Sequence, residues 1–200
     1  MARTATTRVA EPAVPRRDDA GFSLAEMIVV AALIAVGTAI TIPVTMQMVN
    51  RAKNDSASVV AMTFIDSARD RAVAERRNVE LTFQPPNRLV LRRIEVPSGT
   101  RTVVGQIQLE AAQQFMRFNA IDTGDGFGVG TASPAGVVFS GPQPVMFTSD
   151  GSLIDSNGDV TNGTVFFGVP NKPESARAIT VFGVTGMLRT WKWGGASWMQ

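Results

Sequence analysis

The feature that most constrains this chain is an uncharged run of 24 residues, from Met27 to Asn50, which begins directly after the acidic residue Glu26. A helix rises about 1.5 Å per residue, so this run extends about 36 Å, more than the roughly 30 Å hydrocarbon core of a bilayer. The run therefore predicts a single membrane-spanning helix. The alternatives are a cleaved secretory signal and a buried core helix. A cleaved signal has a shorter apolar core followed by a small-residue cleavage site, whereas here apolar residues continue to Met46.

The charges that flank the run predict its orientation. Basic residues are more frequent before the run than just after it: Arg3, Arg8, Arg16 and Arg17 precede it, and Arg51 and Lys53 follow it. Because the cytoplasmic flanks of membrane spans are enriched in lysine and arginine, this bias predicts a cytoplasmic N-terminus. Residues 51–200 are then expected outside the cytoplasm.

The composition excludes several kinds of catalytic site. The chain has 200 residues and contains no cysteine and no histidine, which removes disulfides, thiol nucleophiles, the usual zinc sites and histidine-based dyads. A carboxylate pair or a Ser–Lys dyad finds no support, because the acids are scattered and no lysine stands in a Ser-x-x-Lys context. We therefore expect no enzymatic activity and no cofactor. The net charge of +2, with interspersed charges after residue 50, is also unlike a nucleic-acid-binding tail.

Residues 51–77 continue the helical pattern beyond the uncharged run. Apolar residues recur at helical spacing, at Val59, Val60, Met62, Phe64, Ile65, Ala68, Ala72 and Val73. This stripe predicts that the helix extends past the membrane and packs on a globular domain, ending near Asn78.

The pattern then changes to short alternating segments separated by glycine, proline and other turn residues. Strands are predicted at residues 79–84, 88–96, 102–109, 136–140, 144–148, 163–169, 177–184 and 187–193. Many short strands without intervening helices indicate an antiparallel β-sheet or β-sandwich. The predicted fold class is therefore α+β, with a long N-terminal helix, its first half transmembrane, packed on a β-domain.

The sequence "GFSLAE", residues 21–26, follows a short charged leader and precedes the apolar run. This arrangement resembles the signal sequence of type IV pilins and of type II secretion pseudopilins. The resemblance implies that a prepilin peptidase cleaves between Gly21 and Phe22 and methylates the new N-terminus of Phe22. It also implies that Glu26 pairs with the N-terminal amine of a neighbouring subunit, and that Pro43 occupies a position where the family often has a proline. Without the resemblance, Glu26 could equally extend to the headgroups or lie outside the lipid.

The C-terminal half carries a second, less specific resemblance. The order "FTSDGS", "NGTVFF" and "AITVFGVTGMLRTWKW" is similar to the β-domain of the GspH/FimT group of minor pseudopilins and minor pilins. Asp-Gly and Asn-Gly mark turns in any β-protein. Many major pilins close this region with a disulfide, which this cysteine-free chain cannot form, so the sequence favours the minor branch.

Together these features predict a minor pseudopilin or minor pilin, a structural subunit of a type II secretion pseudopilus or a type IV pilus. Its expected parts are a cleaved leader (residues 1–21), a transmembrane and assembly helix (22–46), an extracytoplasmic half-helix (47–77) and a β-domain (78–200). Its expected location is the bacterial inner membrane and then a filament. Its expected partners are prepilin peptidase, other pilins or pseudopilins, the inner-membrane assembly platform and membrane lipid, and not nucleic acid. The alternatives are a FimT-like minor pilin that binds DNA for uptake and a membrane-anchored extracytoplasmic β-domain of other function.

A weak calcium candidate lies in "DSNGDVTNG", residues 155–163. Asp155, Asn157 and Asp159 alternate like the first ligands of an EF-hand loop. The pattern then fails, because the sixth position is Val160 instead of glycine and the twelfth is Phe166 instead of an acid. An ordinary polar hairpin loop is the preferred interpretation.

A candidate DNA surface near the C-terminus is also weak. Arg189, Trp191, Lys192, Trp193 and Trp198 interleave basic and aromatic residues, as single-strand-binding surfaces do. Some FimT-like pilins bind DNA for uptake through a Gly-Arg-x-Arg motif, but this chain has Gly-Met-Leu-Arg, ending at Arg189. Core or subunit-contact tryptophans are the preferred interpretation.

Overall fold

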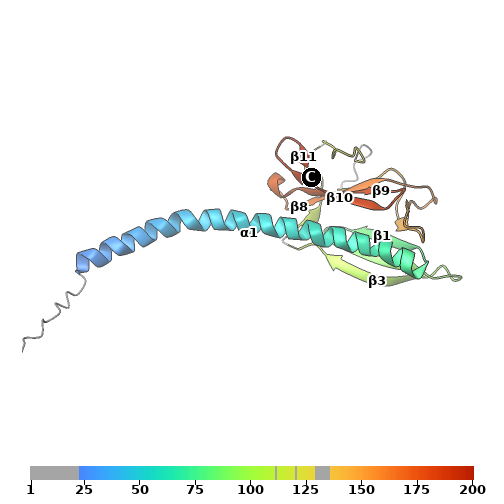
Figure 1. Cartoon of the computed structure of the whole chain (residues 1–200), viewed down its shortest axis with the longest axis horizontal. Coiled ribbons are helices and arrows are strands. Elements are labelled where there is room, and N and C mark those ends of the chain that lie inside the picture. The colour runs from blue at the N-terminus through green and yellow to red at the C-terminus, as the bar shows by residue number, and fades with distance from the viewer. Residues whose placement is uncertain (1–22, 111, 120, 129–135) are drawn as a thin grey trace, which may run out of the picture. The chain divides into compact units, whose positions relative to one another are not determined.

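The computed structural model describes residues 23–110, 112–119, 121–128 and 136–200, with the backbone alone for residues 40 and 42–44. The chain divides into two units, Met1–Val44 and Thr45–Gln200. One long helix, α1 (Leu24–Glu75), is followed by a β-domain (Figure 1). The predicted α+β class is therefore confirmed. The predicted leader and the cleavage residues Gly21 and Phe22 lie outside the described residues.

Helix α1 has a defined end that the sequence predicts within two residues. Arg76 takes a positive φ of 49°, and the N–H groups of Arg76 and Arg77 donate to the carbonyls of Val73 and Ala72 at 3.4 and 3.1 Å. These are the paired bonds of a Schellman motif, which satisfies the last helical carbonyls. The chain then turns directly into the first strand.

Helix α1 is continuous in backbone through Pro43. In the described part of the chain, which leaves out the side chains of residues 40 and 42–44, no helix has the length and apolarity needed to cross a membrane.

The β-domain contains two antiparallel sheets. The first has the order β3 (Arg101–Gln108), β2 (Arg88–Ile94), β1 (Val79–Gln84), β6 (Val145–Phe147) and β7 (Leu153–Ile154). The second has the order β11 (Trp198–Met199), β10 (Met187–Trp193), β9 (Arg177–Phe182), β8 (Gly163–Gly168) and β4 (Gln114–Phe115), with β5 (Val137–Phe139) also paired to β8. A short 3-10 helix, η1 (Pro173–Ser175), precedes β9.

The main core lies between α1 and both sheets. From the helix it takes Ala61, Ile65, Ala68 and Ala72, and from the sheets it takes residues such as Leu81, Phe147, Phe167 and Ile179. The buried face of α1 therefore consists largely of alanine, which lets the helix backbone approach the sheets closely. The predicted stripe is wrong at Val59, Val60 and Val73, which are exposed, because the helical period places them off the face that carries Ala61, Ile65, Ala68 and Ala72.

A second core covers the opposite face of the second sheet. It contains Val138, Phe166, Ala176, Ala178, Trp191 and Trp198. Strand β8 separates the two cores, and all of its residues are buried. Successive side chains of β8 point to opposite faces of the sheet. Val165 and Phe167 therefore lie in the main core, and Phe166 lies in the second core.

Candidate functional site

The start of α1 is where the predicted assembly residue lies. The Oγ of Ser23 accepts a hydrogen bond from the Ala25 N–H at 3.2 Å, and the Ser23 carbonyl accepts one from the Met27 N–H at 3.2 Å. Serine is a preferred residue just before a helix, because its side chain satisfies one of the unpaired N–H groups. Glu26 lies in the first turn with an exposed side chain, where a negative charge suits the helix dipole. Within the described residues it has no ion-pair partner in its own chain.

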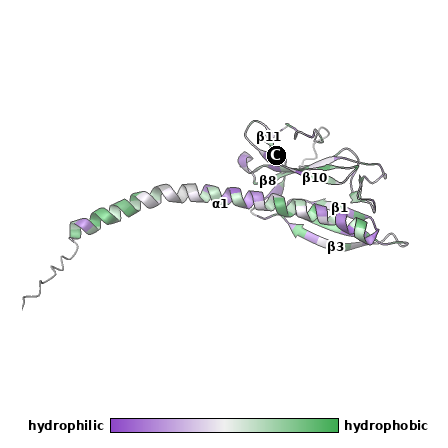
Figure 2. Ribbon diagram, in the orientation of Figure 1, coloured by the Kyte–Doolittle hydropathy of each residue, from purple (hydrophilic) through white to green (hydrophobic). Residues whose placement is uncertain are grey.

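The first turns of α1 expose apolar side chains on all sides of the helix. Those exposed are Leu24, Met27, Ile28, Val29, Val30, Leu33, Ile34 and Val36. Figure 2 shows the same turns coloured mainly as hydrophobic. Burying each such side chain is worth about 1.5–3 kcal/mol, and helices that are apolar all round are normally buried in a protein core or a membrane. This segment therefore needs lipid or other protein chains around it.

Threonine side chains bind the backbone in the helix before Pro43. Thr38 Oγ1 donates to the carbonyls of Ile34 and Ala35 at 2.9 and 3.0 Å, and Thr41 Oγ1 donates to the carbonyl of Gly37 at 2.8 Å. These bonds satisfy the two hydroxyl groups within the helix itself. Pro43 removes one backbone donor, yet the helical backbone passes through it. Its predicted role in assembly stays a prediction.

Two polar pairs fasten α1 to the β-domain within the unit that begins at Thr45. Asp55 accepts hydrogen bonds from Arg177 of β9 at 2.6 and 3.0 Å. Asn54 accepts one from Gln113 at 2.8 Å, and both of these side chains are buried. The sequence analysis missed these four residues. The available signal was Asn54, a polar residue at the spacing that continues the alanine face, seven residues before Ala61.

The weak calcium candidate is a loop held by its own backbone. The buried Asp155 accepts hydrogen bonds through Oδ1 from the N–H groups of Asn157 and Asp159 at 2.8 and 3.1 Å. Asn157 and Asp159 are exposed. No group of three or more potential metal-ligating acids is present in the residues that the structure describes. Asp155 therefore acts here as the residue that shapes the hairpin loop.

The basic and aromatic residues proposed for DNA contact do not form one surface. Trp191 is buried, and its Nε1–H donates to Thr180 Oγ1 at 3.0 Å. Arg189 is paired with Asp125 at 2.6 Å. Lys192 is exposed, but it follows Trp191 in the same strand, so its side chain points to the opposite face of the sheet. This arrangement gives no basis for a nucleic-acid site.

One buried carboxylate joins three strands of the first sheet. Glu80 of β1 forms ion pairs with Arg92 of β2 at 3.2 Å and with Arg101 of β3 at 2.6 Å. Burial opposes ionisation of Glu80, but hydrogen bonds from Arg101, Arg92 and Thr82 outweigh it and lower the pKa of the carboxyl group below its usual value. The network therefore stabilises the sheet in its charged state.

The N-terminal part of the chain matches a known protein family. Residues 16–42 match the family described as "Prokaryotic N-terminal methylation motif", which includes Gly21, Phe22 and Glu26. This finding confirms the prediction of a prepilin-type, pilin-like N-terminal segment. Among curated proteins, none matches the chain.

Two kinds of solved structure are similar to this chain. The type IV minor pilin FimU of Pseudomonas aeruginosa is 14% identical with a TM-score of 0.48, over 75% of this chain and 95% of that chain. The minor pseudopilin EpsH from the Type 2 Secretion System of Vibrio cholerae is 13% identical with a TM-score of 0.44, over 69% of this chain and 98% of that chain.

Proposed function

We propose that this chain is the precursor of a minor pilin or pseudopilin, a non-enzymatic structural subunit of a type II secretion pseudopilus or a type IV pilus. The observation that carries the proposal is the methylation-motif match at residues 16–42. Its placement agrees with the fold, because the motif ends within the apolar half of α1 and the rest of the chain forms an antiparallel β-domain. A prepilin peptidase cleaves between Gly21 and Phe22 and methylates Phe22.

Membrane anchoring before assembly is the second element of the proposal. The uncharged run from Met27 to Asn50 is long enough in helical form to cross a bilayer, and apolar side chains cover all sides of its first half. The arginine-rich leader keeps the N-terminus cytoplasmic. The β-domain then lies on the periplasmic side of the inner membrane until the subunit enters a filament.

Glu26 is the assembly contact in this proposal. Cleavage leaves a positively charged N-terminal amine on Phe22, four residues before Glu26. An ion pair between Glu26 and the amine of a neighbouring subunit satisfies both charges in apolar surroundings, where an unpaired charge is costly. Glu26 is exposed, so a neighbouring chain can reach it, and the pair sets the axial register of successive helices.

The attachment of α1 to the β-domain supports a role in transmitting motion. The pairs Asn54–Gln113 and Asp55–Arg177 fix the helix from its first turns beside the sheets. A helix that is moved axially by assembly therefore carries its β-domain with it.

The test is intact-mass and N-terminal analysis of the full chain produced with and without a prepilin peptidase. We expect a mature chain beginning with methylated Phe22 in the presence of the peptidase and the uncut precursor in its absence. The variant Gly21→Val is the matched control, because it replaces the glycine of the proposed cleavage site and should abolish processing. A precursor that stays uncut with the peptidase, or is cut near Ala32 to Ala39 by ordinary signal peptidase, contradicts the proposal.

A further inference from the structure

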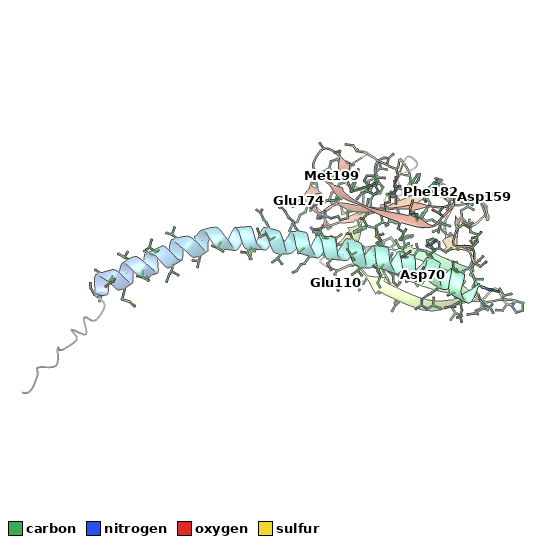
Figure 3. All side chains as sticks on the ribbon, viewed as in Figure 1. Asp70, Glu110, Asp159, Glu174, Phe182 and Met199 are labelled. Atoms are coloured by element: carbon green, nitrogen blue, oxygen red, sulfur yellow. The ribbon has the colours of Figure 1, made fainter. Side chains whose placement is uncertain are left out.

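Two adjoining grooves lie at one end of the β-domain and share Arg51 and Glu174. One has a volume of about 430 Å³ and is lined by Lys53 and Lys172 among others. The other has a volume of about 510 Å³ and is lined by Lys192, Trp193 and Met199 among others. Figure 3 shows Glu174 and Met199 at the same end of the domain. We call this pair of grooves the basal groove.

The basal groove is basic, and its charges are unpaired. Arg51, Lys53, Lys172 and Lys192 face a single acid, Glu174. Across the described residues, none of these five side chains takes part in an ion pair within 4 Å. Elsewhere in the domain Arg92, Arg101, Arg177 and Arg189 are each ion-paired, whereas Arg71 and Arg76 are exposed cations that do not line this groove. The basal groove is therefore a place where several cations are available to an external anion.

The rim of the basal groove also carries side chains suited to a membrane interface. Trp193 is half-buried and packs edge-on against Trp198, with ring centroids 5.4 Å apart. Met199, which pairs with Lys192 between β10 and β11, is 49% exposed. Tryptophan is enriched where a protein meets lipid headgroups, since its indole is amphipathic. Trp193 and Lys192 are neighbours in β10 and point to opposite faces of the strand, and both line the second groove, so its rim offers an apolar and a cationic contact.

The sequence places the basal groove next to the end of the apolar run. Arg51 directly follows Asn50, the last residue of the run. Lys53 lies about 4.5 Å beyond Asn50 along the helix axis. In an anchored chain these two cations therefore lie at the level of the headgroups, where phosphate is concentrated. Arginine and lysine bind phosphate through charge-assisted hydrogen bonds.

We propose that the basal groove binds the headgroups of anionic phospholipids in the outer leaflet of the membrane that holds the helix. This inference rests on the anchoring part of the proposed function for the position of the groove at the headgroups, whereas the affinity of the groove for anionic lipid is measured independently of it. Its consequence is that the β-domain of the precursor is held against the membrane until assembly extracts the helix. Each cation near an anionic surface favours the docked state by about fivefold, and added salt weakens the attraction.

The test uses the full chain reconstituted in phosphatidylcholine vesicles with and without phosphatidylglycerol, the lipids carrying a nitroxide quencher on a fraction of the headgroups. Trp191 and Trp198 are 7% and 9% exposed, so Trp193 is the tryptophan most accessible to quenching. Its signal is the difference between the parent chain and Trp193→Phe. We expect phosphatidylglycerol to raise quenching of Trp193 several-fold, and high salt to reverse the increase.

The double variant Lys172→Gln/Lys192→Gln should lower the docked-to-undocked ratio about 25-fold, at about fivefold per charge. Its matched control is Arg71→Gln/Arg76→Gln, which removes two exposed cations at the far end of α1. An equal loss in both double variants means non-specific attraction and overturns the groove as the binding site. Equal quenching with and without phosphatidylglycerol overturns it as well.

Alkaline extraction of the same vesicles separates this inference from the proposed function. If the chain resists extraction but Trp193 shows no dependence on phosphatidylglycerol, the groove proposal fails while anchoring stands. If alkali removes the chain but its flotation depends on phosphatidylglycerol, salt and the two lysines, anchoring fails while the groove stands. If the chain binds neither vesicle, both fail.

Discussion

Asp55 on α1 and Arg177 on β9 are 122 residues apart in sequence, and their side chains meet with 2.6 Å between Asp55 Oδ1 and Arg177 Nη2. The side chain of Arg177 is 3% exposed, whereas that of Asp55 is 54% exposed. The guanidinium also donates to the carbonyls of Glu174 and Ala176. This pair gives a buried arginine a charged partner, and it ties the helix to the second sheet.

The variant Asp55→Asn should lower the free energy of unfolding of the β-domain by about 1–2 kcal/mol, because a nearly buried cation loses its charged partner while keeping its carbonyl acceptors. The measurement is urea-induced unfolding followed by tryptophan fluorescence. Asp70→Asn is the matched control, since Asp70 is an exposed acid on the same helix, and it should change stability by less than about 0.5 kcal/mol. Equal losses in the two variants would show that the ion pair contributes nothing specific.

Because the buried face of α1 consists largely of alanine, we expect the stability of the domain to depend strongly on the size of the side chains on that face. Ala68 is fully buried in the main core, whereas Ala74 is exposed on the same helix. Ala68→Leu should destabilise the domain by about 1–3 kcal/mol or more, because the added atoms push the helix away from the sheets. Ala74→Leu should be close to neutral, and thermal unfolding compares the two. If Ala68→Leu is as stable as Ala74→Leu, the buried alanines of α1 do not pack closely against the sheets, and the prediction is wrong.

The strands and the N-terminal motif could be predicted because their signals are local. Alternating residues and turn residues gave β1 and β10 with the observed bounds, and the other predicted strands within two residues. The methylation motif is a linear pattern that needs no knowledge of the fold. By contrast, β4, β7 and β11 were missed, because each is two residues long and shows no alternation.

The face of α1 that packs on the sheets, and the polar pairs beside it, could not be predicted from local sequence patterns. Hydrophobicity assigned the bulky Val59 and Val60 to the buried face, but the small Ala57 and Ala61, which the predicted stripe did not include, are the buried residues there. Pairs such as Asn54–Gln113 depend on the three-dimensional fold. The amino-acid sequence alone does not indicate which polar side chains form pairs in the folded domain.

The Glu80 network predicts a loss of stability in acid. Because the folded pKa of Glu80 lies below its usual value of 4.5, its ionised form stabilises the fold above about pH 4.5, and this contribution is lost as the pH falls through the lowered pKa. Glu80→Gln should therefore reduce stability at neutral pH by about 1–3 kcal/mol and flatten the stability profile in acid. Urea unfolding across this pH range measures both effects.

The control for that profile is Glu110→Gln, which changes an exposed acid outside the network and should leave the slope in acid intact. Arg92 and Arg101 give a further check, since Arg101→Gln should weaken the dependence on pH only in part while Arg92 still pairs with Glu80. A parent chain whose stability is the same at neutral pH and at pH 3 to 4 would contradict the assigned role of Glu80.

Glu26→Ala separates processing from assembly. If Glu26 pairs with the N-terminal amine of a neighbouring subunit, its loss leaves that amine unpaired in apolar surroundings, at a cost of about 3–5 kcal/mol. We therefore expect cleavage and methylation at Phe22 to continue, while incorporation into filaments falls roughly a hundredfold or more. Quantitative immunoblotting of sheared filaments against membranes, with mass analysis of the mature chain, measures both steps. Asp70→Ala, an exposed acid further along the same helix, controls for the loss of an acid. Normal incorporation of the Glu26 variant would show that Glu26 does not pair with the amine.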